Sequence, residues 1–425
     1  MCNDVAGGLV NHMNYAETMR SDAYTIINGA ISAVLPDNAV TQALKSVEFP
    51  GRIFLVAVGK AAWQMGKAAV QVLQKPLSGG IIITKYGHVQ GELQGIRCFE
   101  AGHPIPDENT LKATEAVLGM TENLRPTDTV IFLLSGGGSA LFEKPCIPME
   151  ELQEITSQLL AVGADIVEIN VLRKHLSLVK GGRFAEHCAP ARVFSVVLSD
   201  VIGDSLDMIA SGPTVSDSST GKQALAVAEK YKIPLSIAAK QCIERDTPKT
   251  LSNVETQITG SVRELCSAAA KECRKLGYEP IVLTDCLRCE ARDAGSFLAS
   301  IACTYADRKE NIAFIVGGET VVHLTGKGKG GRNQELALSA AEGIAGMENV
   351  LIFSVGSDGT DGPTDAAGGI VDGNSAQRLK VQGKNIAEIL QDNDAYHALR
   401  DINGLVMTGP TGTNVNDFSA VLIRR

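Results

Sequence analysis

Aromatic residues and excess positive charge are both scarce in this sequence. Aromatics make up 4% of the 425 residues, with a single tryptophan, so a large stacking surface for single-stranded nucleic acid is not expected. The formal net charge is -9, which argues against duplex nucleic acid and anionic membranes as partners. The remaining expectation is a small-molecule partner, because an acidic chain can still bind an anion through a local group of Lys and Arg.

Membrane and export signals are also absent. No uncharged apolar run reaches about 18 residues, the first residues lack a basic region followed by an apolar one, and the final LIRR carries no address signal. The ten cysteines are scattered, and the single close pair is Cys286 and Cys289. We therefore expect unpaired thiols and a cytoplasmic protein.

What the sequence does contain is a repeated alternation of strand, turn and helix. Apolar runs such as 52–60, 129–135 and 192–200 end in glycine-rich or polar turns, and amphipathic stretches follow. This pattern predicts an α/β fold with a mostly parallel sheet covered on both faces. With 44% hydrophobic and 20% charged residues the chain can form a sizeable core.

A polar stretch at 245–256 separates two series of this alternation, which predicts two domains, 21–250 and 256–425. In the second series, 311–320, 321–328 and 349–359 are expected to be further strands. In open α/β sheets, ligands bind beyond the carboxyl ends of the strands, so the turns there are the candidate sites.

Two turns of the first domain favour anion binding. Gly59 and Lys60 follow a strand and precede a helix, where free amides and a lysine charge attract an anion. The second turn is a run of bare amides and hydroxyls made by Ser135, Gly136, Gly137, Gly138 and Ser139. It fits neither the GxxxxGK[ST] phosphate loop nor the GxSxG nucleophile elbow.

The densest motif is GKGKGGRNQE in the second domain. Its expected phosphate-binding residues are Lys327, Gly328, Lys329, Gly330, Gly331 and Asn333, next to Arg332. The letters fit GxGxxG from Gly326, but the cations in the loop favour a phosphoryl group over a dinucleotide.

Carboxylates follow two further strands and are candidate Mg²⁺ ligands, because Mg²⁺ prefers oxygen donors beside substrate phosphates. The proposed ligands are Asp200, Asp204 and Asp358. Asp207, Asp361 and Asp365 are interpreted as structural or as solvated turn residues.

The ordered set of motifs resembles the class II glycerate kinases, which are glycerate 2-kinases with a C-terminal MOFRL domain. The set includes VGKAA, AGHPIPDENT, LLSGGGSALF, INVLRKHLSLVKGGRFA, LSDVIGDSLDMIASGPT, GGET, GKGKGGRNQE, VGSDGTDGPTDAAG and GPTGTNVNDF, and it spans roughly residues 20–425. The resemblance implies ATP-dependent phosphorylation of D-glycerate at its 2-hydroxyl to give 2-phosphoglycerate and ADP. It also implies a Rossmann-like N-terminal domain, an active site in the cleft between two domains, and Lys60 and Arg332 as catalytic residues.

On this interpretation, Lys60 and Arg332 neutralise the γ-phosphoryl charge, Mg²⁺ bridges phosphate oxygens, and the amides of 136–139 hold either the glycerate carboxylate or a phosphate. Two alternatives stay open. One is an NAD(P)H-dependent hydroxypyruvate reductase that uses the 326–331 loop for pyrophosphate and His103 or His323 as an acid. The other is a non-catalytic sugar-phosphate-binding protein. Either the kinase or its alternatives could form a homo-oligomer.

Overall fold

The computed structural model describes residues 14–45, 47–73, 75–199, 201–203 and 206–425, which form two compact units. One unit comprises residues 36–259, and the other comprises residues 14–35 together with 260–425. The sequence had placed residues 21–35 in the N-terminal domain, and the structure assigns them to the C-terminal unit instead.

The reason for this difference is the packing of helix α1 (Asn14–Ala33) on helix α11 (Val262–Lys275). Its Met19 and Ile26 are fully buried in one core with residues of α11 and the C-terminal sheet. Asp22 of α1 also accepts a hydrogen bond from the Tyr278 hydroxyl at 2.7 Å. Contacts between residues more than 200 positions apart are not visible in local sequence patterns.

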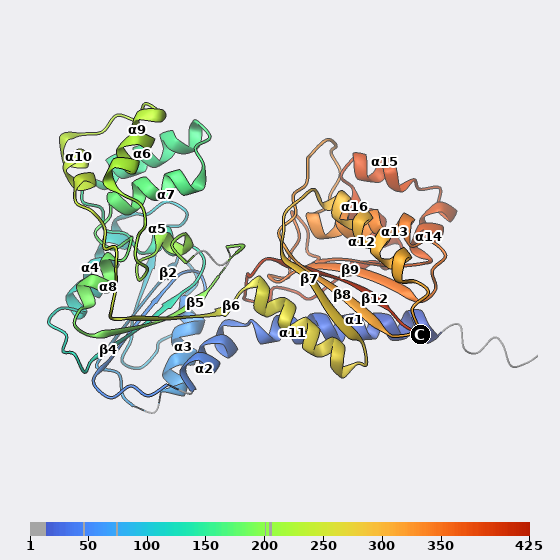
Figure 1. Ribbon diagram of the computed structural model, residues 1–425, viewed down its shortest axis with the longest axis horizontal. Helices are drawn as coiled ribbons and strands as arrows, with labels where there is room; N and C mark the ends of the chain where they lie inside the picture. The colour runs from blue at the N-terminus through green and yellow to red at the C-terminus, as the bar shows by residue number, and fades with distance from the viewer. Residues whose placement is uncertain (1–13, 46, 74, 200, 204–205) are drawn as a thin grey trace, which may run out of the picture. The chain divides into compact units, whose positions relative to one another are not determined.

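The unit of residues 36–259 is built on a six-stranded sheet (Figure 1). Its order is β3 (Arg97–Ala101), β2 (Gly79–Lys85), β1 (Ile53–Val58), β4 (Thr129–Leu134), β5 (Arg192–Leu198) and β6 (Val254–Gly260). Strands β1 to β5 pair in parallel, as the sequence predicted. This is the Rossmann strand order, in which successive strands are added first on one side of β1 and then, from β4 onward, on the other side. The change of side leaves a crevice at the carboxyl ends of β1 and β4.

Helices cover both faces of this sheet, and its strands β1 and β4 are therefore buried throughout. Helices α2 (Pro36–Lys45) and α3 (Ala62–Val72) pack on the face that carries Leu55 and Ile131. Helices α4 (Glu108–Met120), α5 (Gly138–Leu141) and α8 (Arg183–Cys188) pack on the face that carries Val56 and Phe132. Uninterrupted apolar strands are what a sheet covered on both sides requires.

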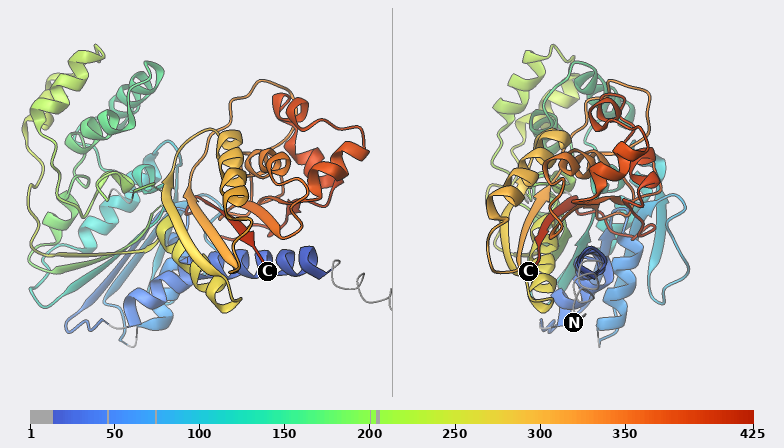
Figure 2. Two further views of the ribbon diagram at one scale, coloured as in Figure 1. Left: turned by 45° about the vertical axis from the view of Figure 1, so that its right-hand side comes forward. Right: turned by 90° about the vertical axis from the view of Figure 1, so that its right-hand side faces the viewer.

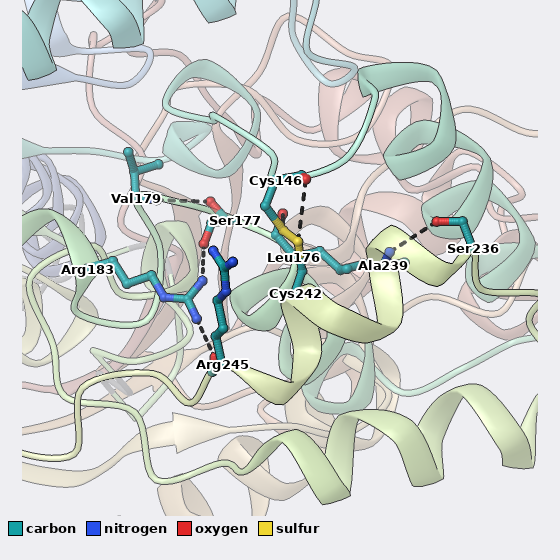
Figure 3. The surroundings of a disulfide bond; sticks show 9 residues. All are labelled: Cys146, Leu176, Ser177, Val179, Arg183, Ser236, Ala239, Cys242 and Arg245. Carbon is teal, nitrogen blue, oxygen red and sulfur yellow. Dashed lines mark hydrogen bonds between the residues drawn. A yellow bond between two sulfur atoms is a disulfide. The ribbon is translucent and has the colours of Figure 1, made fainter.

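Four more helices form a group with its own apolar core at the end of the sheet where α5 lies (Figure 1 and Figure 2). They are α6 (Met149–Ala161), α7 (Ile166–His175), α9 (Gly221–Lys230) and α10 (Ile237–Glu244), and the turn η1 (Ile209–Ser211) lies beside α5 and α7. A disulfide joins Cys146, which precedes α6, to Cys242 in α10, with the two Cα atoms 6.4 Å apart (Figure 3). The expectation of unpaired thiols is therefore wrong for these two cysteines, while Cys286 and Cys289 are free.

The sheet of the C-terminal unit is mixed rather than mostly parallel. Its order is β11 (Leu405–Val406), β10 (Gly368–Asp372), β9 (Val350–Gly356), β12 (Asp417–Ile423), β8 (Ile312–Gly318) and β7 (Glu279–Leu287). Strands β7 and β8 are parallel, and the other pairs are antiparallel. The pattern of alternation did not predict this, because β12 comes from the end of the chain and inserts between β8 and β9.

Helices α1 and α11 cover one face of this sheet, and α12 (Ala291–Tyr305) and α13 (Arg332–Gly343) cover the other. Three short helices complete the unit: α14 (Ser375–Val381), α15 (Ile386–Gln391) and α16 (Ala395–Asp401). The segment 321–328, expected to be a strand, is a loop apart from one isolated bridge at Val321. In the described residues, no helix combines the length and the apolar character needed to cross a bilayer.

Candidate active site

The turns after β1 and β4 meet at the point where the strand order reverses. Gly59 has φ +122°, and a side chain there would collide with Ser135, whose oxygen would lie 2.2 Å from the added carbon. The backbone amide of Ala61 donates to the Ser135 hydroxyl at 3.1 Å, and the Lys60 amide donates to Gly136 O at 2.9 Å. Ser135 was predicted as a ligand-binding residue, but its buried hydroxyl holds the two turns together.

The backbone amides of residues 136–139 remain open. None of the four donates a hydrogen bond to another part of the described chain. Gly137, with φ +89°, precedes the short helix α5, and its carbonyl accepts from the amides of Ala140 and Leu141. Gly136, Gly137 and Ser139 are partly exposed. The turn thus presents backbone amides without acceptors at the edge of the sheet, and this arrangement suits an anion.

Lys60 adds a positive charge beside these amides. Its side chain is exposed, and its ammonium makes no ion pair or hydrogen bond within the described residues. A methyl group on Gly137 would lie 3.3 Å from Lys60 Cγ and 3.0 Å from the His103 ring. Burial lowers the pKa of His103, and the charges of Lys60, Lys85 and His88 lower it further. This corner is therefore electropositive, and burial together with these charges favours the neutral form of His103.

Buried charged side chains lie next to the same turn. No site residue had been predicted among them from the sequence. Lys180 is fully buried and donates to the carbonyls of Ser139 at 2.9 Å and Phe142 at 3.0 Å. Its ion pair with the fully buried Glu143 spans 3.4 Å. Burial lowers the pKa of Lys180 to about 8. Lysines and arginines within an amphipathic stretch look like surface residues, so no sequence signal marked them.

The aspartates after β5 are only partly visible. Asp200 and Asp204, two of the predicted metal ligands, lie outside the described residues. Asp207 accepts from the buried Lys174 ammonium at 3.1 Å, and Asp217 accepts from the same group at 3.3 Å. Asp207 is thus tied into the protein by an ion pair, which agrees with its interpretation as structural.

In the C-terminal unit, Arg332 opens helix α13 and is held by carboxylates. Its Nε and Nη2 donate to the two oxygens of Asp417 at 2.5 and 3.1 Å, and its Nη1 donates to Glu319 at 2.8 Å. Burial acts to lower the pKa of Arg332, but the Asp417 hydrogen bonds and both carboxylate charges raise it above its usual value. Arg332 was expected to neutralise the γ-phosphoryl charge, yet its Nε and Nη2 are both used by Asp417, and a third of the side chain stays exposed.

The 326–331 loop does not have the open amides that its glycines suggested. The amides of Gly326, Lys327 and Lys329 donate to the side chains of Asn393, Asp392 and Asp394, respectively, at 2.9 to 3.0 Å. The Gly328 amide donates to Asp392 O at 2.7 Å. The glycines are needed because a side chain on Gly326 or Gly328 would collide with this facing turn. Lys329 lies over the Tyr396 ring at 4.6 Å, so the expected anion loop is a packed element.

The residues around the start of α13 are likewise paired within the protein. Asp361 is buried and accepts from the amides of Asn333 at 3.2 Å and Gln334 at 2.9 Å. Burial raises the pKa of Asp361 to about 6. Asn333, predicted to bind phosphate, is itself buried, and its side chain bonds to Asp361 and Ser354. In the structure, Asn333 therefore positions the start of helix α13.

The remaining predicted residues are solvent-accessible. Asp358 is half-buried, and its Oδ1 accepts from the Thr360 amide at 2.9 Å. Asp365 accepts from the Tyr396 hydroxyl at 2.7 Å. His323 is exposed and lies 3.3 Å from Glu290. Within the described ranges, no group of three or more His, Cys, Asp or Glu side chains is placed to hold a metal ion.

Comparison with known proteins places this arrangement in a family. Residues 22–244 match the model of a domain of unknown function, DUF4147, and residues 312–417 match the model of the MOFRL family. The chain is 52% identical over 413 residues to a protein of Thermotoga maritima named D-glycerate 2-kinase, covering 96% of this chain and 99% of that protein.

A crystal structure of glycerate kinase from Thermotoga maritima superposes with a TM-score of 0.92, covering 96% of this chain and 100% of that chain at 52% identity. A relative from Agrobacterium vitis, provisionally named a hydroxypyruvate reductase, is 38% identical over 387 residues, which is 88% of this chain and 100% of that protein.

The fold, the site and these matches define a two-unit α/β phosphotransferase. The chain belongs to the glycerate 2-kinase family, in which a DUF4147 region precedes a MOFRL region.

Proposed function

We propose that this protein transfers the γ-phosphoryl group of ATP to the 2-hydroxyl of D-glycerate and releases 2-phosphoglycerate and ADP. The observation that carries the proposal is the turn of residues 136–139 beside Lys60. It combines open amides with a lysine that has no partner among the described residues, and it lies where the strand order reverses. The name of the Thermotoga maritima relative supports this choice of substrate.

Lys60 and Arg332 are the two residues that we propose neutralise the transferred group. Phosphoryl transfer depends mainly on positioning and on neutralising charge on that group. Lys60 would supply an exposed ammonium for this purpose. Arg332 brings a guanidinium that Asp417 and Glu319 hold in a fixed orientation, with further N–H groups on its two terminal nitrogens. The amides of 136–139 bind the anionic end of a substrate.

Asp358 is the described residue that supports a proposed divalent cation. Asp358 uses one carboxylate oxygen for a single backbone amide and keeps other lone pairs for a cation. Asp200 and Asp204 are further candidates outside the described residues. Mg²⁺ would be held by Asp358 together with phosphate oxygens, and it would neutralise charge on the phosphates.

The packed 326–331 loop argues against the reductase alternative. A dinucleotide turn needs free amides to receive pyrophosphate, and four consecutive amides of this loop are already bonded to residues 392–394. The turn after β1, where a Rossmann fold would place its pyrophosphate, contains Gly59 and Lys60 instead of a GxGxxG sequence.

The experiment that separates the candidates measures two reactions on one preparation. ADP release with D-glycerate and MgATP is expected, and NADH oxidation with hydroxypyruvate is not. NADH oxidation without ADP release would replace the kinase with a reductase. Tight binding of a sugar phosphate without either reaction would favour a non-catalytic binding protein. Loss of ADP release in excess chelator, restored by Mg²⁺, is expected if the cation is required.

A further inference from the structure

Arg173, in helix α7, reaches the last residue of the turn of residues 136–139. Its Nη2 donates to the carbonyl oxygen of Ser139 at 3.0 Å. The same carbonyl accepts from the buried Lys180 ammonium at 2.9 Å. Two cations therefore converge on the last residue of the turn that we propose binds a substrate anion.

The two cations differ in whether they keep N–H donors that are not already bonded within the protein. Lys180 bonds to three carbonyls, of Ser139, Phe142 and Ala210, and it also pairs with Glu143. Arg173 uses Nη2 alone. Its Nε is buried without an acceptor, and its Nη1 has no acceptor among the described residues, while the residue as a whole is half-buried. Arg173 thus keeps donors for a ligand, whereas Lys180 is a fixed part of the scaffold.

The local charge is also unbalanced. Among the described residues, Glu143 is the one carboxylate whose charge acts on Arg173, and it already pairs with Lys180. Two cations against one carboxylate leave a positive charge in a poorly solvated place. Burial lowers the pKa of Arg173, but a guanidinium stays protonated at neutral pH. Such a charge favours an anionic partner more strongly than a surface arginine would.

We propose that Arg173, together with the open amides of 136–139, binds the carboxylate of the acceptor substrate and so determines its specificity for a hydroxy acid. This inference rests on the proposed function. Gly137 lies beside Lys60 and Ser139 beside Arg173, and two residues span at most about 7 Å. With a hydrogen bond of about 3 Å at each end, a 2-hydroxy acid can bridge that separation with its carboxylate on Arg173 and its 2-hydroxyl toward Lys60. The planar guanidinium matches a carboxylate with paired donors.

The test compares Arg173→Lys and Arg173→Ala with the unchanged protein in steady-state kinetics. We expect KM for D-glycerate to rise about 10- to 100-fold in Arg173→Ala, as for the loss of one charge-assisted contact. KM for ATP should stay within about twofold. Glyceramide, which has an amide in place of the carboxylate, should be a much poorer substrate than glycerate for the unchanged protein. The two variants should lose that preference.

Arg183→Lys provides a matched control. Arg183 follows in the same segment and also donates to carbonyls, those of Ser177 at 2.5 Å and Arg245 at 2.6 Å, but both terminal nitrogens are used (Figure 3). This variant should keep both KM values and the preference for glycerate. Thermal unfolding of all three variants checks that a kinetic change is not a loss of fold.

Three outcomes would overturn the inference. A rise in KM for ATP with an unchanged KM for glycerate would assign Arg173 to a phosphate of the donor. Unchanged KM values for both substrates would show that Arg173 is not part of the site. An equal rise in KM for glycerate in Arg183→Lys would show that the effect is structural. A wild-type protein that consumes no ATP with glycerate would overturn the proposed function itself, which separates that failure from a failure of the Arg173 assignment.

Discussion

The pairing of Arg332 with Asp417 leads to a quantitative prediction about Arg332→Lys. Lysine keeps the positive charge but cannot contact both oxygens of Asp417 and also Glu319, so two of three hydrogen bonds are lost. Removing one partner of a fully buried pair costs about 3–5 kcal/mol. Because Arg332 is one-third exposed and lysine retains one bond, we expect about 1–2 kcal/mol of destabilisation. The misplaced charge should also lower kcat by about 10²- to 10³-fold.

The assay exploits the single tryptophan of the chain, Trp63, which lies in helix α3 of the other unit. Urea unfolding followed by circular dichroism should shift in Arg332→Lys, whereas the Trp63 fluorescence transition should not. Arg378→Lys is the matched control, because Arg378 pairs with Asp372 in the same unit at 2.8 Å and is more exposed. It should leave kcat unchanged.

The reasoning about Arg332 is refuted if Arg332→Lys retains its kcat and raises KM for glycerate alone, since Arg332 would then bind the substrate carboxylate. An Asp417→Asn variant completes the cycle. The effects of Asp417→Asn and Arg332→Lys on the free energy of unfolding should be non-additive by about 1–2 kcal/mol. Simple additivity would mean that the two residues do not act as a pair.

Three further predictions concern the unit of residues 36–259. Lys60→Ala should lower kcat by about 10²- to 10³-fold with an unchanged melting temperature, and near-normal turnover would remove Lys60 from the mechanism. Gly137→Ala should weaken substrate binding and activity, because φ is +89° and the added carbon would lie 3.0 Å from His103; full activity would show that the turn tolerates a side chain. Arg52 holds the pKa of Asp128 at about 2, against 3.8 ordinarily, so this carboxylate stabilises the fold above about pH 4, and the effect is lost as pH falls toward 2. Asp128→Asn should therefore lower the free energy of unfolding by about 1 kcal/mol at pH 7, a value reduced because Arg52 is exposed. The substitution should not change kcat, and it should not change stability at pH 2. An equal loss of stability at both pH values would contradict the assignment.

The sequence predicted well those features that depend on neighbouring residues. Buried apolar runs ending in glycine marked β1 and β4, and three glycines after β4 marked the turn with open amides. Parallel strands bring such turns to one edge, so local patterns alone could identify the 136–139 turn as a candidate site.

Features that depend on distant partners were not predictable in this way. The glycines of the 326–331 loop show that the backbone approaches something closely, but not that residues 392–394 take up its amides. The burial of Arg173 and Lys180 depends on how α7 meets the turn after β4. Helix α1 packs on α11 although about 230 residues separate them along the chain.

The measurement that tests the central proposal most directly is identification of the product by ³¹P NMR after incubation with MgATP and D-glycerate. We predict equimolar ADP and 2-phosphoglycerate, and neither product in Lys60→Ala on the same time scale. Formation of 3-phosphoglycerate, or hydrolysis of ATP without phosphorylated glycerate, would contradict the proposal.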